Sequence, residues 1–398
     1  MSPAATVTSR VARGARGLGP AVAFLLGVAG LVGDGRAATQ GSPAKTPLSQ
    51  TDTPYRGNRD GISYGAYGEL RFGHDRQAGV SNPDWFSFGQ AGGFVDVRFH
   101  PRVRLALKGA YDRGQDDFTL ERAAIEYRTG GPLRFHAGVL PAPLGTTNLS
   151  HDAPACEFAE RSLVATDLVG VPYSELGIGV AGRTESGTFA YELDVVTGYD
   201  DGVVMGGEGG TRVPSGRNNY GDQNGVPALA ARVVWSPGGG SELGLAAQSG
   251  RYNRTEISGV TVDEARSAHL FVADAASSLA GFRLFSEAAL ALVDVPPGLE
   301  GLYAERQWGL SLEAGRTLLQ PVRKGWKRSR LTASLRADAV DLDARAVGDS
   351  RARVTASLNF RHANRAVVRA GWYYEARHDR FDNRTPFAGL TLTAASYF

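Results

Sequence analysis

The sequence predicts an all-β fold, a transmembrane antiparallel β-barrel of about sixteen strands. Three observations indicate this fold: an alternating segment that ends the chain at Phe398, a series of similar segments before it, and an export signal at the start. In the last segment, one face carries Leu390, Leu392, Ala394, Ser396 and Phe398, and the other carries Thr391, Thr393, Ala395 and Tyr397. Lipid admits a spanning backbone only as a helix or a closed barrel. Taken alone, this segment also fits the last strand of a soluble domain.

The N-terminal segment predicts a signal peptide over residues 1–37. Three arginines precede an apolar run from Leu18 to Val32, and small residues follow at Gly35 and Ala37, where a signal peptidase would read them. The run is about 15 residues long and broken by glycine, which is too short for a spanning helix.

The next segment, residues 38–60, predicts a disordered leader, because it is rich in Ser, Thr, Pro, Gln and Gly and has no hydrophobic periodicity. The barrel is therefore expected over residues 61–398.

Segments with period-two alternation, bounded by turn residues, recur along this region. We expect strands at Ile62–Phe72, Gly92–His100, Arg102–Asp112, Phe118–Thr129, Leu133–Val139, Glu175–Arg183, Thr188–Gly198, Val226–Ser236, Glu242–Arg251, Arg266–Asp274, Gly281–Val293, Glu305–Arg316, Arg330–Ala339, Arg351–Arg361, Arg365–Ala376 and Phe387–Phe398. Their number, about sixteen, is even, as bacterial barrels require.

The connections alternate between tight and long. Tight turns are expected at His100-Pro101, Thr129–Pro132, Thr184–Gly187, Pro237–Ser241 and His362–Asn364, and long loops at Gly73–Ala91, Leu140–Ser174, Tyr199–Gly225, Tyr252–Ala265, Asp294–Ala304 and Arg377–Pro386. Short periplasmic turns and long extracellular loops are typical of such barrels, so both termini are expected in the periplasm. Thr317–Ser329 is an exception: a nominal turn that is long and basic.

Alternation also assigns faces. If Val103, Leu105 and Leu107 face lipid, then Arg102, Arg104 and Lys108 face the lumen, and the same argument places Arg122 and Arg134 inside. Further inward bases are Arg98, Arg183, Arg232, Arg283, Arg336, Arg353 and Arg369, against the inward acids Glu69, Asp96, Glu192, Asp194, Glu287 and Asp338. The lumen is expected to be polar with a basic bias. Alternatively, these arginines only solvate the wall and pair with the acids.

The composition excludes several classes of function. A formal charge of +2 argues against a nucleic-acid binder. The single Cys156 cannot form an internal disulfide and lacks a catalytic context. The seven histidines show no zinc spacing, and no nucleophile elbow or phosphate loop is present, so we expect no enzyme, cofactor or metal. Calcium binding by the Asp- and Asn-rich stretch Tyr199–Asn224 is an alternative to local turns.

The third long loop carries the most specific motifs. The run from Gly138 to Gly145 ends a strand with glycine and enters the loop through Pro143-Leu144-Gly145; Glu160-Arg161-Ser162 follows, and the next strand is rich in glycine from Gly177 to Gly182. Over residues 92–200 this order resembles the phosphate-selective porin O and P family. The terminal Phe398 resembles the C-terminal signature of bacterial outer-membrane barrels.

The resemblance implies a bacterial outer-membrane porin with sixteen strands, a homotrimer, whose third loop folds into the channel. The usual lysine before the Pro-x-Gly turn is Pro141 here and the usual arginine before the next strand is Ser174, which leaves phosphate selectivity open.

We therefore expect passive diffusion of small hydrophilic solutes with a modest preference for anions, phosphate among them. In the expected constriction the loop residues Asp152, Glu157, Glu160 and Arg161 oppose the wall residues Arg102, Arg104, Lys108, Arg122 and Arg134. The alternative is a structural or adhesive barrel without an open channel.

Overall fold

The structure, a computed structural model, describes residues 57–59, 61–112, 117–205, 210–218, 220–363 and 365–398. The predicted signal peptide and residues 38–56 of the predicted leader lie outside the described residues. At the end of that leader, β1 (Gly57–Arg59) pairs with the start of the first barrel strand.

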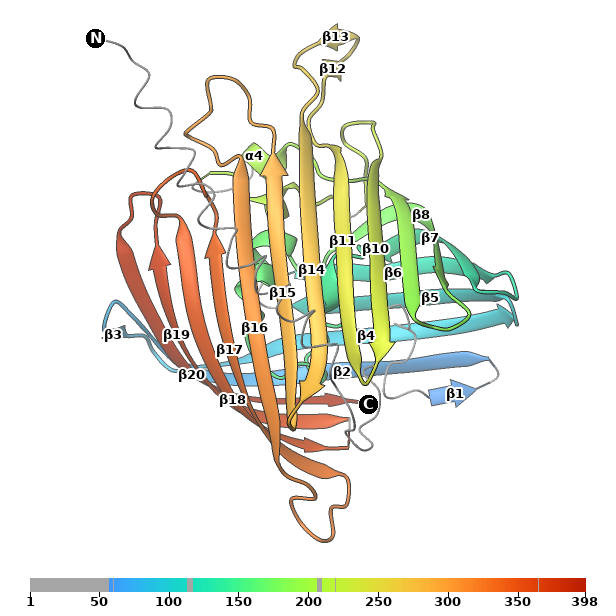
Figure 1. The fold of residues 1–398 in the computed structure, drawn as a ribbon, viewed down its shortest axis with the longest axis vertical. Helices are drawn as coiled ribbons and strands as arrows, with labels where there is room; N and C mark the ends of the chain where they lie inside the picture. Colours follow the sequence, from blue (N-terminus) through green and yellow to red (C-terminus); the bar gives the residue numbers. More distant parts are fainter. Residues whose placement is uncertain (1–56, 60, 113–116, 206–209, 219, 364) are drawn as a thin grey trace.

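Sixteen long strands form one antiparallel barrel (Figure 1). They are β2 (Ile62–Gln77), β4 (Trp85–His100), β5 (Val103–Asp112), β6 (Asp117–Arg128), β7 (Leu133–Pro141), β8 (Ser174–Arg183), β9 (Phe189–Val196), β10 (Ala228–Gly238), β11 (Ser241–Arg251), β14 (Ser267–Leu279), β15 (Phe282–Val293), β16 (Arg306–Leu319), β17 (Ser329–Asp341), β18 (Ser350–His362), β19 (Ala366–His378) and β20 (Arg384–Tyr397). Each predicted strand is present, and the predicted fold is confirmed.

The barrel closes between β20 and β2. The register pairs Tyr67 with Tyr397, and beyond it the backbone N–H of Ala66 donates to Phe398 O at 2.8 Å while the N–H of Phe398 donates back to Ala66 O at 2.9 Å. No edge of the sheet is left unpaired at this seam, as spanning a membrane requires.

One expected loop is much shorter than predicted. The sequence suggested a long loop over Gly73–Ala91, but β2 continues to Gln77, where it still pairs with Phe387 of β20, and β4 begins at Trp85. Glycine and charged residues hid these strand ends, because a strand that rises above the membrane needs no apolar face. The connection between them holds the short β3 (Val80–Ser81).

The outer wall is apolar, as the alternation predicted. On β20 Leu390, Leu392 and Phe398 are exposed on the outside, whereas Thr393 and Tyr397 are buried inside. Outward aromatic pairs such as Tyr127 with Phe135 and Phe189 with Trp235 lie near the short turns. An apolar band flanked by aromatic residues is the surface that a barrel presents to lipid. The chain is an outer-membrane β-barrel protein.

Among the described helices, none combines the length and the apolar character that crossing a membrane demands.

The connections lie as expected, with short turns at one end of the barrel and long loops at the other. The basic connection between β16 and β17 is at the short-turn end, and the register from β16 to β18 is continuous, so the long turn is genuine. At the opposite end a hairpin of β12 (Glu256–Ile257) and β13 (Val260–Thr261) projects from the loop between β11 and β14.

Candidate functional site

The third loop, residues 142–173 and called L3 below, connects β7 to β8 and lies inside the barrel. It contains the short helix α3 (Gly145–Leu149) and one π-helical turn, η3 (Ala165–Val169). Asn148 closes its neck: the side-chain amide donates to Ala142 O at 2.7 Å and to Tyr173 O at 2.9 Å, and its oxygen accepts from the Tyr173 N–H at 2.8 Å. The inward folding predicted for Leu140–Ser174 is confirmed.

One side of L3 is apolar and packs on the inner wall of β14 to β16. Leu144, Leu163 and Leu168 are fully buried in a cluster with inward residues of these strands, among them Leu270, Val272, Ala289 and Ala291. Gly309 on β16 permits this approach, because a Cβ there would lie 2.8 Å from Leu168. The lumen is therefore not polar throughout: its wall is apolar beneath L3, which the predicted polar lumen did not anticipate.

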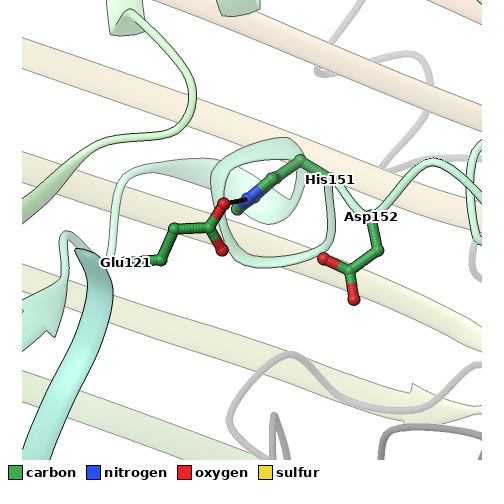
Figure 2. A group of neighbouring side chains, drawn as sticks. All are labelled: Glu121, His151 and Asp152. Atoms are coloured by element: carbon green, nitrogen blue, oxygen red, sulfur yellow. Dashed lines mark ion pairs between the residues drawn. The ribbon is translucent and has the colours of Figure 1, made fainter. Parts of the chain in front are cut away.

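A second side of L3 is held by a charged cluster. The Lys108 ammonium of β5 lies 2.6 Å from Glu121 of β6 and 2.5 Å from Asp152 of L3. Figure 2 shows the Glu121 carboxylate and the His151 imidazole facing each other, 2.9 Å apart. The other ring nitrogen of His151 is 2.7 Å from Asn148 O, and the Tyr397 hydroxyl donates to Asp152 at 3.2 Å.

Glu121, His151 and Asp152 lie close enough together to share a metal ion. However, the Lys108 ammonium already lies between the two carboxylates. Two acids, a lysine and a histidine in contact form a salt-bridge cluster that fixes L3 to the wall. The geometry therefore supports an anchor here.

On the wall formed by β17 to β19, called the arginine wall below, arginines donate to backbone carbonyls of L3. Arg361 of β18 donates to Pro154 O and Cys156 O, and Arg369 of β19 donates to Ala153 O at 2.8 Å and Cys156 O at 2.9 Å. Higher in the loop, Arg336 of β17 and Arg353 of β18 both donate to the carbonyl of Arg161. These guanidinium groups are almost fully buried.

Glu157 is an acidic residue of L3 that contacts this side of the barrel, and Asp167 is another, 2.6 Å from Arg351 of β18. The Glu157 carboxylate lies 3.1 Å from Arg283 and 3.5 Å from Arg361, and it accepts a hydrogen bond from Asn359 at 2.8 Å. Burial alone would raise the pKa of the Glu157 carboxyl, but the attraction of Arg361 and Arg283 outweighs burial and holds the pKa below its ordinary value.

The other two loop residues predicted at the constriction, Arg161 and Glu160, differ in their contacts. Arg161 forms an ion pair with Asp112 of β5 at 2.5 Å. Glu160 has one carboxylate oxygen that is buried and has no hydrogen-bond partner among the described residues.

The predicted wall residues occupy three different places. Arg104 and Arg122 pair with Glu126, Arg104 at 2.8 Å, and Arg134 lies on the neighbouring strand β7. Lys108 belongs to the cluster that binds L3. Arg102 is in the exposed turn between β4 and β5 and does not join the others.

Sequence reasoning missed several contact residues. Glu121 is the extra residue of a β-bulge between Lys108↔Arg122 and Gly109↔Leu120, so simple alternation could not place it inside. Arg361 and Tyr397 occupy buried inward positions, which the sequence analysis did not name, and no sequence signal indicated which wall residues L3 would reach.

Comparison with solved structures gives the same fold throughout. The anion-selective porin from Comamonas acidovorans matches with a TM-score of 0.55 at 11% identity, covering 85% of this chain and all of that one. The chain has the porin fold. The outer membrane channel DcaP of Acinetobacter baumannii matches with a TM-score of 0.56 at 12% identity, covering 86% of this chain and 99% of that one. OprB of Pseudomonas putida also gives 0.56 at 12% identity, covering 85% of this chain and 94% of that one.

Sequence comparison is less specific. No family model matches the chain, so the resemblance to the phosphate-selective porins rests on the motifs alone. An uncharacterized protein of Aquifex aeolicus (strain VF5) is 23% identical over 159 residues, which make up 35% of this chain and only 33% of that protein.

Proposed function

We propose that this protein is a passive outer-membrane channel for small hydrophilic solutes, with a modest preference for anions. The observation that carries the proposal is L3 itself, held inside the barrel between the Lys108 cluster and the arginine wall. A polar loop fixed across a wide barrel narrows the aqueous path and lines it with charge. The proposal includes no catalytic activity.

The anion preference follows from how the arginines are paired. Arg361 and Arg369 each face one carboxylate, Glu157 at 3.5 Å and Glu69 at 2.5 Å, and both also donate to backbone carbonyls, which carry no net charge. Near the other side of L3, Arg104, Arg122 and Arg134 face two carboxylates, Glu126 and Glu192, so the cations outnumber the acids there. Guanidinium groups stay charged at any physiological pH and offer forked donors to phosphate or carboxylate oxygens. Small organic or inorganic anions, phosphate among them, are therefore the proposed solutes.

The test is the reversal potential of single channels in a planar bilayer under a salt gradient. The wild type should favour anions, and Arg122→Gln with Arg134→Gln should shift the potential toward cations without closing the pore. The charge-matched control, Arg254→Gln with Arg384→Gln at exposed positions on the loop end of the barrel, should change it little. A wild-type channel that already favours cations would refute the anion preference and leave the channel intact.

One observation favours the alternative of a structural barrel. L3 contacts inward residues of strands on several sides of the lumen: β5, β6, β10, β14, β15 and β17 to β20. A loop bonded so widely could close the path. Discrete conductance steps would exclude this alternative, and their complete absence from folded protein would support it.

We also propose a homotrimer. A porin-fold structure, OmpT of Vibrio cholerae, is described in a trimer form. On this chain a shallow apolar groove of about 860 Å³ crosses the outer wall near the seam, lined by small residues such as Gly68, Gly93, Gly109 and Ala394. A Cβ at Gly93 would meet only Gly65 O, at 4.0 Å, which is ordinary van der Waals contact, so Gly93→Trp should leave the monomer folded and break the trimer. Native mass spectrometry would show this, with Leu229→Trp on another part of the outer wall as control.

A further inference from the structure

A basic turn lies at the short-turn end of the barrel, outside the constriction. Residues 320–328, the basic turn, join β16 to β17 and carry four cations with no Asp or Glu: Arg323, Lys324, Lys327 and Arg328. All four side chains are exposed, and none forms an ion pair within the described part of the chain. Figure 1 shows this turn extending beyond the other turns at its end.

Hydrogen bonds give the basic turn a defined shape. The Trp326 N–H donates to Arg323 O at 2.8 Å, and the Ser329 hydroxyl donates to Trp326 O at 2.7 Å while accepting from the Val322 N–H at 3.0 Å. The Ala363 N–H of the next turn donates to Arg328 O at 2.9 Å. The four cations are therefore held together at one place on the barrel.

The basic turn leans on the lipid-facing side of the wall. The Trp326 ring packs 5.7 Å from Phe360 and 5.8 Å from His362. Both partners occupy outward positions of β18, because Asn359 and Arg361, which alternate with them along the strand, are buried inside. Nearby, outward Arg316 lies 5.1 Å over the ring of Phe282. Cations and aromatic rings thus stand side by side where the apolar band ends.

We propose that the basic turn binds the phosphate headgroups of anionic phospholipids at the leaflet that meets the short turns. Trp prefers the membrane interface, and clustered Lys and Arg beside a membrane attract anionic lipids. A soluble acidic partner would need only the charges. The packing of Trp326 on outward β18 residues instead directs the cations toward the bilayer.

The test uses the full-length protein in nanodiscs of phosphatidylglycerol and phosphatidylcholine, with native mass spectrometry counting the lipids that stay bound. Wild type should retain phosphatidylglycerol preferentially. Replacing all four cations of the basic turn with Gln should lower that preference on the order of tenfold. The charge-matched control replaces Arg254, Arg345, Arg380 and Arg384, which are exposed at the loop end of the barrel, with Gln and should retain the preference. Heat-modifiable electrophoretic mobility checks that every variant is folded.

Equal lipid selectivity in wild type and the basic-turn variant would overturn the proposal. A second result would also overturn it: the basic-turn variant loses the wild type's binding to soluble polyglutamate but retains lipid as the wild type does. That result would assign the basic turn to a soluble acidic partner. A separate variant, Trp326→Ala, keeps the charges and should reduce phosphatidylglycerol retention only in part.

Discussion

At the scale of single residues, small side chains decide which charged groups meet. His136 of β7 and Asp194 of β9 contact each other at 2.6 Å across β8, since Gly179 lies between them and any Cβ there would overlap Asp194. The alternation predicted that Asp194 and Glu192 face inward. It could not predict this contact, because a register is set by pairing across strands and not by the pattern along one strand.

Glu157 provides a test at this scale. Its pKa is lowered in the folded protein, so its ionised form stabilises the fold above the ordinary carboxyl pKa of about 4.3, and that contribution is lost as the pH falls through the lower folded value. Glu157→Gln should therefore reduce the free energy of unfolding at pH 7 by about 1–3 kcal/mol. Urea unfolding from pH 7 to pH 3 should show the two proteins converging at the acidic end. A constant difference over this range would contradict the ion pair.

At the scale of elements, the position of each strand was predictable and the path of L3 only in outline. Strands of one lipid-facing barrel share a local pattern, which the sequence shows directly. L3 folds inward because Leu144, Leu163 and Leu168 find an apolar wall, and that wall consists of inward Leu270 and Val272 on a strand far along the chain. Nothing in the local sequence of β14 distinguishes a leucine that faces inward and contacts a loop from a leucine that faces outward and contacts lipid.

Shortening L3 tests its role. Deleting residues 153–156 removes the carbonyls that Arg361 and Arg369 bind, so the loop should retreat and single-channel conductance should rise. Deleting 257–260 from the projecting β12–β13 hairpin, a cut of equal length, should leave conductance unchanged. Gly309→Leu should act in the opposite direction, because its side chain would push L3 from the wall toward the centre. Unchanged conductance in the L3 deletion would mean that the loop does not set the constriction.

At the scale of the whole molecule, the two ends of the barrel differ in length and charge. The loop end carries many acids, such as Asp200, Asp263, Asp294 and Asp379, whereas the turn end carries the basic turn. The lengths of the connections predicted that one end of the barrel is periplasmic and the other extracellular. The fold confirms that the short turns lie at one end and the long loops at the other. Their orientation in the membrane stays a prediction.

Epitope tags test that orientation. A tag after Gly259, in the hairpin at the loop end, should label on intact cells, and a tag after Gly240, in the turn between β10 and β11, should label only after the outer membrane is permeabilised. Both glycines have open space around them, so the insertions should be tolerated. Labelling at Gly240 alone on intact cells would invert the assignment.

The seam between Ala66 and Phe398 has a consequence for biosynthesis. β20, the last strand of the barrel, and Phe398 pair with the first barrel strand, so the barrel cannot close until these residues have been exported. Until then β2 has an open edge that can pair with another chain, and closure waits for the contact with the greatest sequence separation in the sheet. A nascent copy of this protein would therefore depend on factors that shield its first strand, and loss of the two hydrogen bonds between Ala66 and Phe398 would weaken the closure that ends this dependence.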